Sequence, residues 1–573
     1  MSKYSKSKAA IQILLVLGIL IFVNIIANMR MGNKPLYSYW DLTEDKRYSL
    51  TDGTRELLNN LDERVFVRVL LEGDFPAGFK RLQAATRDML DDFRSESGYI
   101  DYRFENPNEG TAKEVNERRK KLAEEGITPV KLNIRDTGGS SNQYIYPFAV
   151  FYYKGRSVRV NLLESEAPGM PQQLVLNNSI KLLEYRFANA ITTLSNTYRQ
   201  VVAFTTGHGE LNAYETADFE KSLREFYDTG RIHLDSLTAI DTMVSVLVVA
   251  KPRGAFSEKD KFKLDQYVMN GGKILWLLDK VNVNLDSLQG KAGDYFPSTF
   301  ECNLDDLLFR YGARVQPNLV MDMQCSHIPL VVGYEGNEPQ FENFKYPYHL
   351  VIAPTGQHRI TSNVGPVNLL YASSIDTIET KTKITKTTLL SSSEHSRFQR
   401  LPAALNFNFL QQPLNPQKFN KGSQRVGLLL EGKFPSLYQN RVDQQMKDAL
   451  ASLGQNFKPL GKPTRMIVVS DGDIAKNEFN PQSGSFKPLG YNPFEKYTFA
   501  NKDFLINAIE YLINPNGVIM ARGKEIKLRL LNTVKAKQEK TKWQWFNIGL
   551  PLLFLLLFGI IYNYIRYRKY GRG

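Results

Sequence analysis

Two long apolar stretches without any charged residue stand near the ends of the 573-residue chain. The first covers residues 9–29 and the second covers residues 543–565. A helix of about 20 apolar residues is about 30 Å long, which matches the hydrocarbon core of a bilayer. The pattern therefore predicts a transmembrane helix in each stretch, with a water-facing body between them.

The first stretch differs from a cleaved signal peptide. Signal peptides have an apolar core of about 7–15 residues followed by a small-residue cleavage site. The stretch at residues 9–29 has 21 residues without a charge and no clear site of this kind. We therefore expect an anchor that is retained.

The first part of the body alternates between strand and helix patterns. Runs rich in β-branched and aromatic residues predict strands, and apolar residues spaced by three or four predict helices that face a core. The expected strands lie at residues 65–71, 99–104, 145–153 and 157–163, and the expected helices lie near residues 79–93, 112–125 and 174–194. We interpret residues 36–197 as a small α/β domain.

The second part of the body has the rhythm of a parallel α/β sheet. Its strand patterns are continuous apolar runs, which are typical of strands buried on both faces. The expected strands lie at residues 201–205, 245–250 and 273–278 and near residues 369, 389, 426 and 466, and a final helix is expected at residues 504–512. Residues 330–365 and 396–423 are rich in proline, asparagine and aromatic residues, which predicts insertions or long loops. We interpret residues 198–515 as a second α/β domain and residues 516–542 as a connector.

The net charge of +14 is concentrated at the two ends of the chain. Residues 1–34 carry five basic residues and no acid, and residues 535–573 carry eight basic residues and one acid, so only +2 remains for the body. A nucleic-acid-binding protein concentrates basic charge on a folded face instead. This distribution argues against nucleic acid and for contact with the anionic headgroups of a lipid bilayer.

The same basic residues orient the predicted spans. Lys3, Lys6 and Lys8 precede the first span, and Arg566, Arg568, Lys569 and Arg572 follow the second. The positive-inside rule then places residues 1–8 and 566–573 in the cytoplasm, and the body lies outside the cytoplasm. Lys535, Lys537, Lys540 and Lys542 oppose this orientation because they would lie on the outer side.

A glycine-rich loop follows the first strand of the second domain. Its residues Gly207, His208, Gly209 and Glu210 form the sequence GHGE. Backbone N–H groups in such a loop can bind an anion, and the His and Glu side chains can act as bases or ligands. The alternative, which we favour, is a tight turn that needs its glycines, with His208 bonded locally.

Two further sites deserve comparison with simpler alternatives. Asp471 and Asp473 follow a predicted strand and could hold Mg²⁺, but a solvated acidic turn is the better interpretation. Cys325 and His327 place a thiol near an imidazole without an assignable base. Cys302 and Cys325 could form a disulfide, although two buried free thiols are favoured.

Motifs of common catalytic sites are missing from the sequence. It has no G-x-x-x-x-G-K-[ST], no G-x-S-x-G, no H-E-x-x-H and no paired C-x-x-C. We therefore predict no catalytic residue, no metal and no cofactor, and a protein that is not an enzyme.

Four segments in a fixed order resemble a known family. They are DLTEDKRYSLTDGT at residues 41–54, LLEGDFPAGFKRL at residues 70–82, LDDLLFRYGARVQPNLVMDMQC at residues 304–325, and NKDFLINAIEYL at residues 501–512. Together with the TGHGE loop and the two anchors, they resemble the auxiliary, substrate-binding-like subunits of a gliding-motility ABC transporter of Bacteroidota (GldG-like).

The resemblance implies a two-pass inner-membrane protein with its body in the periplasm. It implies a complex with a polytopic ABC permease and, indirectly, a cytoplasmic ATPase. It also implies that the second domain is similar to glutamine-amidotransferase-like domains that have lost catalysis.

Three functions remain open at this point. The first is a non-enzymatic auxiliary subunit that couples the permease and the ATPase to the periplasm. The second is a periplasmic binding protein for a sugar, a peptide or a cell-wall fragment. The third, which we rank last, is a residual hydrolase that uses His208, Glu210 or Cys325.

Overall fold

The computed structural model describes most of the chain as a mixed α/β protein. The described residues are 14–24, 30–31, 34–35, 49–136, 139–163, 172–195, 199–288, 294–354, 358–362, 364–411, 414–442, 444–452, 456–482, 484–515 and 539–570. The chain divides into two compact units, Met1–Glu525 and Ile526–Gly573. The first unit contains both predicted α/β domains, and the second contains an apolar helix.

A four-stranded sheet forms the centre of the N-terminal domain. Its order is β4-β3-β7-β8, in which β3 and β4 are parallel and the other neighbours are antiparallel. The strands are β3 (Val65–Val69), β4 (Ile100–Phe104), β7 (Phe148–Tyr153) and β8 (Arg156–Asn161). The strands predicted at residues 145–153 and 157–163 pair as a hairpin across Lys154 and Gly155, and both residues have positive φ, as the tight turn requires.

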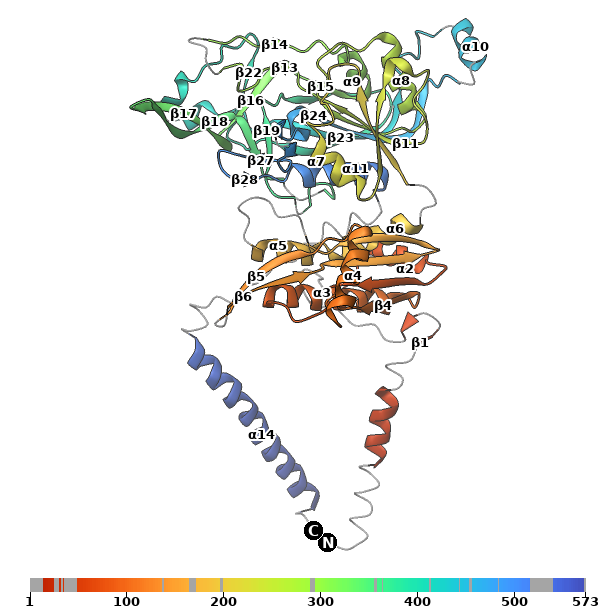
Figure 1. Cartoon of the computed structure of the whole chain (residues 1–573), viewed down its shortest axis with the longest axis vertical. Helices are drawn as coiled ribbons and strands as arrows, with labels where there is room; N and C mark the ends of the chain where they lie inside the picture. Colours follow the sequence, from red (N-terminus) through yellow and green to blue (C-terminus); the bar gives the residue numbers. More distant parts are fainter. Residues whose placement is uncertain are drawn as a thin grey trace. The chain divides into compact units, whose positions relative to one another are not determined.

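Helices pack against this sheet (Figure 1), and the apolar side chains between them are buried. They are α2 (Asp52–Asn59), α3 (Ala77–Glu96), α4 (Ala112–Glu124), α5 (Gln172–Lys181) and α6 (Leu183–Ser195). Phe79 and Phe93 of α3 and Phe187 of α6 belong to one core with the strands. The single helix predicted at residues 174–194 is two helices, α5 and α6. The predicted pattern also missed a hairpin of β5 (Val130–Asp136) and β6 (Gly139–Ile145).

The larger domain contains a seven-stranded sheet in the order β10-β9-β11-β12-β24-β23-β21. The first five strands are parallel, and β23 and β21 continue the sheet antiparallel. The bounds are β9 (Val201–Thr206), β10 (Asp228–His233), β11 (Val244–Ala250), β12 (Ile274–Leu277), β21 (Ile384–Ser391), β23 (Arg425–Pro435) and β24 (Leu460–Val469). Numbered by their order in the chain, the parallel strands run 2-1-3-4-5, which is a doubly wound arrangement.

Both faces of this sheet are buried, as its apolar strands predict. Val246 and Val248 of β11 belong to one core cluster, whereas Leu247 and Val249 belong to another. Helices α7 (Ala217–Arg224) and α11 (Asn501–Ile513) cover the first face, and α8 (Glu258–Met269) and α9 (Asp305–Tyr311) cover the second (Figure 1).

A three-stranded sheet contains the longest strands of this domain's insertion. Its strands are β17 (Cys325–Glu335), β18 (Glu338–Ile352) and β19 (Val367–Leu370). Of the two alternatives predicted for residues 330–365, an insertion or a long loop, the long loop is therefore wrong. Pro329 and Pro339 fit the strands because the distal part is a two-stranded ribbon, so a missing N–H on its free edge costs no ladder bond. Residues 396–423 contain β22 (Ser396–Arg400) and are otherwise without long elements in the described part.

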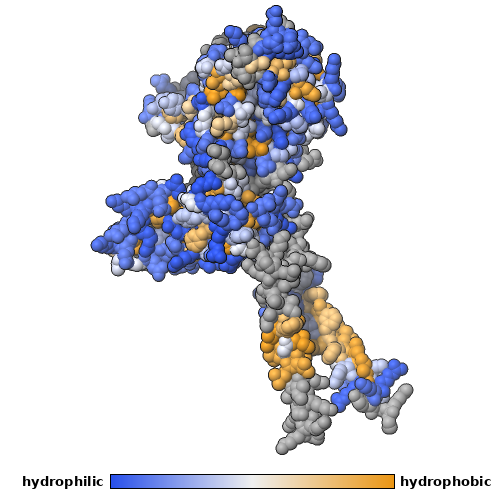
Figure 2. Space-filling model, turned by 90° about the vertical axis from the view of Figure 1, so that its right-hand side faces the viewer, coloured by the Kyte–Doolittle hydropathy of each residue, from blue (hydrophilic) through white to orange (hydrophobic). Residues whose placement is uncertain are grey.

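The second unit contains α14 (Lys540–Tyr570), which includes the predicted span at residues 543–565. Its apolar window has a mean hydropathy of 2.1 and is unburied, so the helix is long and apolar enough to cross a membrane. Figure 2 shows hydrophobic surface on the apolar helices. Within the predicted first span, the described part is a shorter apolar helix, Leu14–Asn24. The rest of that span, Lys3, Lys6, Lys8 and Arg572 lie outside the described residues, as does most of the connector.

Candidate functional site at the carboxyl ends of the parallel strands

The five parallel strands of the large domain end at one edge of the sheet, and polar residues follow them there. The GHGE loop follows β9, Lys251 follows β11, Asp279 lies just beyond β12, and Asp471 and Asp473 follow β24. In a 2-1-3-4-5 sheet, the chain turns in opposite directions after strands 1 and 3, which leaves a crevice where ligands commonly bind. The GHGE loop and Lys251 flank this position.

The GHGE loop is a tight turn that bonds to itself and to the loop after β11. Gly207 and Gly209 have φ values of 113° and 73°, which favour glycine. The N–H of His208 donates to Oε2 of Glu210 at 2.7 Å. The carbonyl of His208 accepts from the N–H groups of Arg253 and Gly254 at 2.8 and 2.7 Å. The N–H of His208, which could otherwise bind an external anion, is therefore already bonded to the carboxylate of Glu210.

The imidazole of His208 lies between two carboxylates and is 6% exposed. Its Nδ1 lies 3.4 Å from Oε1 of Glu210, and its Nε2 lies 3.4 Å from Oδ2 of Asp260. The ring stacks on Phe256 with a centroid distance of 3.7 Å. Burial by itself lowers the pKa of His208, but the two carboxylates outweigh it, so the pKa lies above its usual value. Burial raises the pKa of Glu210, and the hydrogen bond with His208 turns the net shift downward.

Asp260 of α8 holds this helix to the GHGE loop. Its N–H donates to Oγ of Ser257 at 3.1 Å, so Ser257 caps the N-terminus of this helix. Its carboxylate reaches Lys263 Nζ at 2.9 Å as well as His208. These contacts are those of a locally bonded turn. That Gly207, His208, Gly209 and Glu210 bind a ligand stays a prediction.

The second part of the site is a buried ion-pair cluster around Lys251. Its Nζ lies 2.9 Å from Oδ2 of Asp279 and 2.5 Å from Oδ2 of Asp473. Asp279 also accepts the N–H of Gly472 at 2.5 Å. Asp471 accepts the N–H of Asp473 at 2.7 Å with one oxygen. The cluster therefore joins the loops that follow three neighbouring strands, β11, β12 and β24.

Asp471 is fully buried, so the predicted solvated acidic turn is wrong. The insertion covers this turn: the N–H of Leu370 donates to Oδ2 of Asp471 at 2.7 Å, and the N–H of Ser373 donates to the carbonyl of Ser470 at 3.2 Å. Burial raises the pKa values of Asp471 and Asp279. The sequence pattern could not show this cover, because it comes from a strand about 100 residues earlier in the chain.

Asp279, Asp471 and Asp473 present oxygen atoms within 4.8 Å of one another, a spacing that could hold a metal ion. The ammonium group of Lys251 already pairs with two of these carboxylates. Burial lowers the pKa of Lys251, but Asp279 and Asp473 raise it further, so the net shift is upward and the group stays charged. The chain thus supplies its own cation to the cluster.

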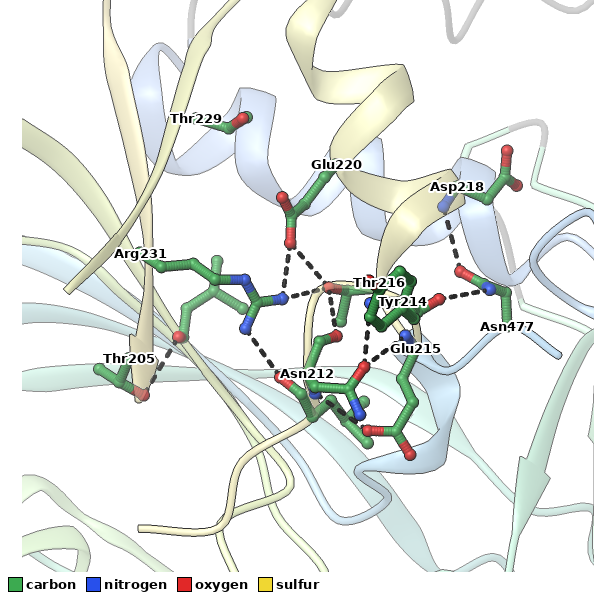
Figure 3. Close-up of polar contacts among 12 residues, drawn as sticks. Thr205, Asn212, Tyr214, Glu215, Thr216, Asp218, Glu220, Thr229, Arg231 and Asn477 are labelled. Carbon is green, nitrogen blue, oxygen red and sulfur yellow. Dashed lines mark hydrogen bonds and ion pairs between the residues drawn. The ribbon is translucent and has the colours of Figure 1, made fainter. Parts of the chain in front are cut away.

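A hydrogen-bond network fixes the segment between the GHGE loop and α7 (Figure 3). Arg231 of β10 donates to Oε1 of Glu220 at 2.6 Å and to the carbonyl of Leu211 at 2.9 Å. On the other side, Asn477 donates to the carbonyl of Tyr214 at 3.0 Å. The segment is therefore held between β10 and the chain that follows β24.

The two cysteines are free thiols in the structure, so the disulfide alternative is wrong. Burial raises the pKa of Cys302 to about 11 and that of Cys325 to about 12. His327 does not activate Cys325, because its Nδ1 lies 2.6 Å from Oε1 of Glu495. A thiolate nucleophile is therefore not prepared at either position.

Sequence reasoning missed Lys251 and Asp279, which complete the ion-pair cluster. A usable signal existed, because each follows directly after a continuous apolar run, SVLVVA and KILWLL. Charged residues at the carboxyl ends of adjacent parallel strands meet at one edge of the sheet. Of the four charged residues in this cluster, the sequence analysis named only Asp471 and Asp473 as a candidate site.

The fold and the site define a class of protein. Its α/β body contains a doubly wound sheet, and the charged side chains at the carboxyl edge of that sheet form ion pairs with one another. The same chain has an exposed apolar helix, α14. Residues 199–508 match a family described as ABC-type uncharacterized transport system. This match covers more than half of the 573 residues, so the chain belongs to that family of ABC transporter auxiliary proteins. Its role therefore lies with an ABC transporter, in association with other transporter components and with the membrane.

Other comparisons add less. Residues 44–152, in the N-terminal domain, match a domain of unknown function. No curated protein matches the chain. A solved structure titled mmIFT52 N-terminal domain is similar at 14% identity and a TM-score of 0.31, over 55% of this chain and 97% of that chain.

Proposed function

We propose that this protein is a non-enzymatic subunit of an ABC transporter complex linked to gliding motility, anchored in the inner membrane at both ends. Its body would lie in the periplasm and couple a polytopic permease and a cytoplasmic ATPase to that compartment. The observation that carries the proposal is the family match over residues 199–508 in a chain that also has the exposed apolar helix α14.

The charges and apolar residues at the ends support two anchors. Arg566, Arg568 and Lys569 end α14, as expected for the cytoplasmic end of a span. Leu14–Asn24 is helical and apolar, and it lies inside the uncharged stretch of residues 9–29. Two anchors would fix the orientation of the body, whereas a single anchor would let it rotate.

The site supports a role without catalysis. The charged groups at the carboxyl edge of the sheet are engaged with one another: Lys251 with Asp279 and Asp473, and His208 with Glu210. The 2-1-3-4-5 sheet is compatible with a glutamine-amidotransferase-like domain, whose nucleophile would be a cysteine at this edge. The only cysteines of the sequence are Cys302 and Cys325, and neither follows β9, β11 or β12 directly.

Native co-purification tests the complex. The full chain, tagged and extracted from its own membranes in mild detergent, is expected to elute with a polytopic permease and an ATPase. The co-eluting proteins are identified by mass spectrometry. Recovery of the chain alone under conditions that keep other ABC complexes intact would argue against the proposal.

Thiol labelling tests the topology. In a background with Cys302→Ala and Cys325→Ala, a cysteine is introduced either at Glu338 in the body or at Tyr567 near the end of α14. A membrane-impermeant maleimide is expected to label position 338 while the inner membrane is intact, and position 567 only after it is broken. The reverse pattern would contradict a periplasmic body.

Spreading of a deletion strain on agar tests the link to gliding separately. Loss of spreading that is restored by the full chain is expected. Normal spreading together with intact co-purification would remove gliding from the proposal and keep the transporter subunit.

A ligand-binding role is the second candidate, and a cavity in the N-terminal domain favours it. The cavity has a volume of about 560 Å³ and lies where β3 and β4 end, lined by charged side chains that include Arg68, Arg103, Glu109 and Arg118. A thermal-shift screen of the full chain with sugars, peptides and cell-wall fragments tests this role. Hits that vanish in an Arg118→Met variant would support it, and an empty screen would argue against it.

A further inference from the structure

The distal part of the β17–β18 hairpin is a ribbon that extends from the large domain (Figure 1). We refer to residues 329–344 as the arm. Among the described residues, the two strands of the arm pair only with each other, since β19 pairs with His349–Ile352 at the base. The turn contains Gly336, which has a φ of 64°. A two-stranded ribbon with no third strand is marginally stable in water, so the arm needs a stabilising contact beyond the pairing of its own two strands.

The strand register sorts the side chains of the arm into two different faces. Val331 is paired with Phe341, and Tyr334 is paired with Pro339. Residues 339 and 341 share a face because side chains alternate along a strand. The bulge between Val331 and Gly333 brings Tyr334 onto that same face. This apolar face is therefore built from Val331 and Tyr334 on β17 and from Phe341 and Pro339 on β18.

Apart from Leu330 and Phe344 near the base, the opposite face and the tip are polar and acidic. Glu335 is paired with Glu338 at the tip, and Leu330 is paired with Glu342. Gln340 is paired with Gly333, and its amide donates to Oε2 of Glu335 at 2.9 Å. Within residues 329–344 there are three glutamates and no lysine or arginine. The arm therefore carries a charge of −3 on a short, exposed element.

The apolar face is open to solvent in the chain. Val331 is 46% exposed, Phe341 is 64% exposed and Tyr334 is 72% exposed. Contiguous apolar side chains on an extended element mark interaction surfaces, whereas single exposed ones need no explanation. The bulge and the acidic tip are features that protect a free ribbon edge from indiscriminate pairing. The arm thus combines an open apolar face with protection against non-specific association.

The charge of the arm decides what can cover that face. An anionic lipid surface would repel a charge of −3, so the arm is not suited to membrane insertion. Two arms packed against each other would place a charge of −6 on one small assembly, which disfavours a second copy of the chain. A protein surface with an apolar groove and a lysine or arginine rim fits both the face and the charge.

We propose that the arm is a docking element for a different protein, one that presents an apolar groove rimmed by basic residues. Phe341 and Tyr334 fill the groove, and Glu335 and Glu338 at the tip of the arm reach the basic rim where the groove ends. This inference stands on the geometry of the arm and does not depend on the assignment to an ABC transporter complex.

Site-specific photo-crosslinking in intact cells tests the proposal with the full chain. The photoreactive residue p-benzoylphenylalanine is placed at Phe341 or at Tyr334, and for the matched control at Gln340, the neighbour of Phe341 on the opposite face. The expected result is one cross-linked product with a different protein from both apolar positions, with a yield at Gln340 lower by about tenfold, a change equivalent to about 1.4 kcal/mol.

A charge test separates specific docking from general stickiness. With the photoreactive residue at Phe341, the change Glu335→Lys and Glu338→Lys at the tip is expected to reduce the cross-link about tenfold. Glu379→Lys, an exposed acid outside the arm, is expected to leave the yield unchanged. The cross-linked peptide of the partner is expected to lie beside lysine or arginine residues.

Several outcomes would overturn the proposal. A product that contains only peptides of this chain would show self-association, and a product with lipid would show membrane contact. Equal yields from Phe341 and Gln340, no product at either apolar position, or an unchanged yield after the charge reversal would each show that the arm does not dock as described.

Discussion

Nζ of Lys251 lies 2.9 Å from Oδ2 of Asp279, and each side chain is 8% exposed. Lys251 directly follows the buried strand β11, and Asp279 lies just beyond the buried strand β12, both at the carboxyl edge of the sheet. Such a pair repays the desolvation of its charges only while both partners are present. Each of them is therefore a sensitive reporter of whether this edge of the sheet is closed as the structure shows.

Replacing Lys251 with methionine is expected to destabilise the chain by about 3–5 kcal/mol, because Asp279 and Asp473 would keep buried charges without a partner. Lys462→Met, at an exposed position of β24, is the control and should change stability by no more than about 0.5 kcal/mol. Denaturant unfolding of the full chain in detergent measures both. Equal effects of the two variants would contradict the ion-pair cluster.

Gly472→Ala is expected to destabilise the chain by about 1–3 kcal/mol through overpacking. An added Cβ would lie 2.4 Å from Cβ and 2.8 Å from Cα of Lys251, and the backbone of Lys251 has little freedom to move. Gly230→Ala is the matched control, since nothing lies within 4 Å of its added Cβ. The same unfolding measurement applies. A neutral Gly472→Ala would mean that the loops after β11 and β24 are further apart.

Divalent cations should distinguish the wild type from a Lys251→Ala variant. With the ammonium group present, Mg²⁺ is expected to leave the Tm of the wild type unchanged. Without it, Asp279, Asp471 and Asp473 become a free carboxylate cluster, and Mg²⁺ at ten times its Kd should stabilise the variant by about 1.4 kcal/mol. Differential scanning fluorimetry measures the shift. A wild-type Tm that rises with Mg²⁺ and falls with a chelator would contradict the assignment of Lys251 as the internal cation.

The ion pair of His208 and Glu210 gives the stability of the chain a defined pH dependence. The pKa of His208 is raised from 6.5, so its contribution is complete below pH 6.5 and is lost as the pH rises through the folded-state value. The pKa of Glu210 is lowered from 4.5, so its contribution is complete above pH 4.5 and is lost as the pH falls through its folded-state value.

The stability difference between the wild type and His208→Gln should therefore be largest between about pH 4.5 and 6.5 and smaller at pH 9. Unfolding midpoints at a series of pH values test this. His395→Gln is the control, because His395 is exposed. A difference that grows with increasing pH would mean that His208 is neutral in the folded chain.

The parts of the fold that the sequence predicted are those in which local pattern and tertiary environment agree. Strands β9, β11 and β12 are apolar runs and are buried on both faces, so the pattern alone identifies them. Strand β10 was missed because its sequence, DTGRIH, is polar and lies at the edge of the sheet. The arm was missed because its prolines suggested a loop, and only its position at a free edge makes them compatible with strands.

The candidate site was predicted in part for a similar reason. Spacing along the chain identified the GHGE loop and the two aspartates of the β24 turn, since each set is contiguous. Asp260 reaches His208 from a helix 52 residues later, and Lys251 reaches Asp473 across 222 residues. Contacts of this kind depend on the order of strands in the sheet, which no local pattern specifies.

The order of the strands also has a consequence for how the chain matures. Strand β12 ends at Leu277, but its neighbour β24 begins only at Leu460, after the whole insertion with its arm. During synthesis, the apolar strand β12 must therefore remain an unpaired edge of an incomplete sheet until the fifth parallel strand, β24, has been made. Non-local pairing of this kind is slow and exposes surfaces that aggregate. The chain would therefore most need a chaperone during the time before its synthesis has reached residue 469, the end of β24.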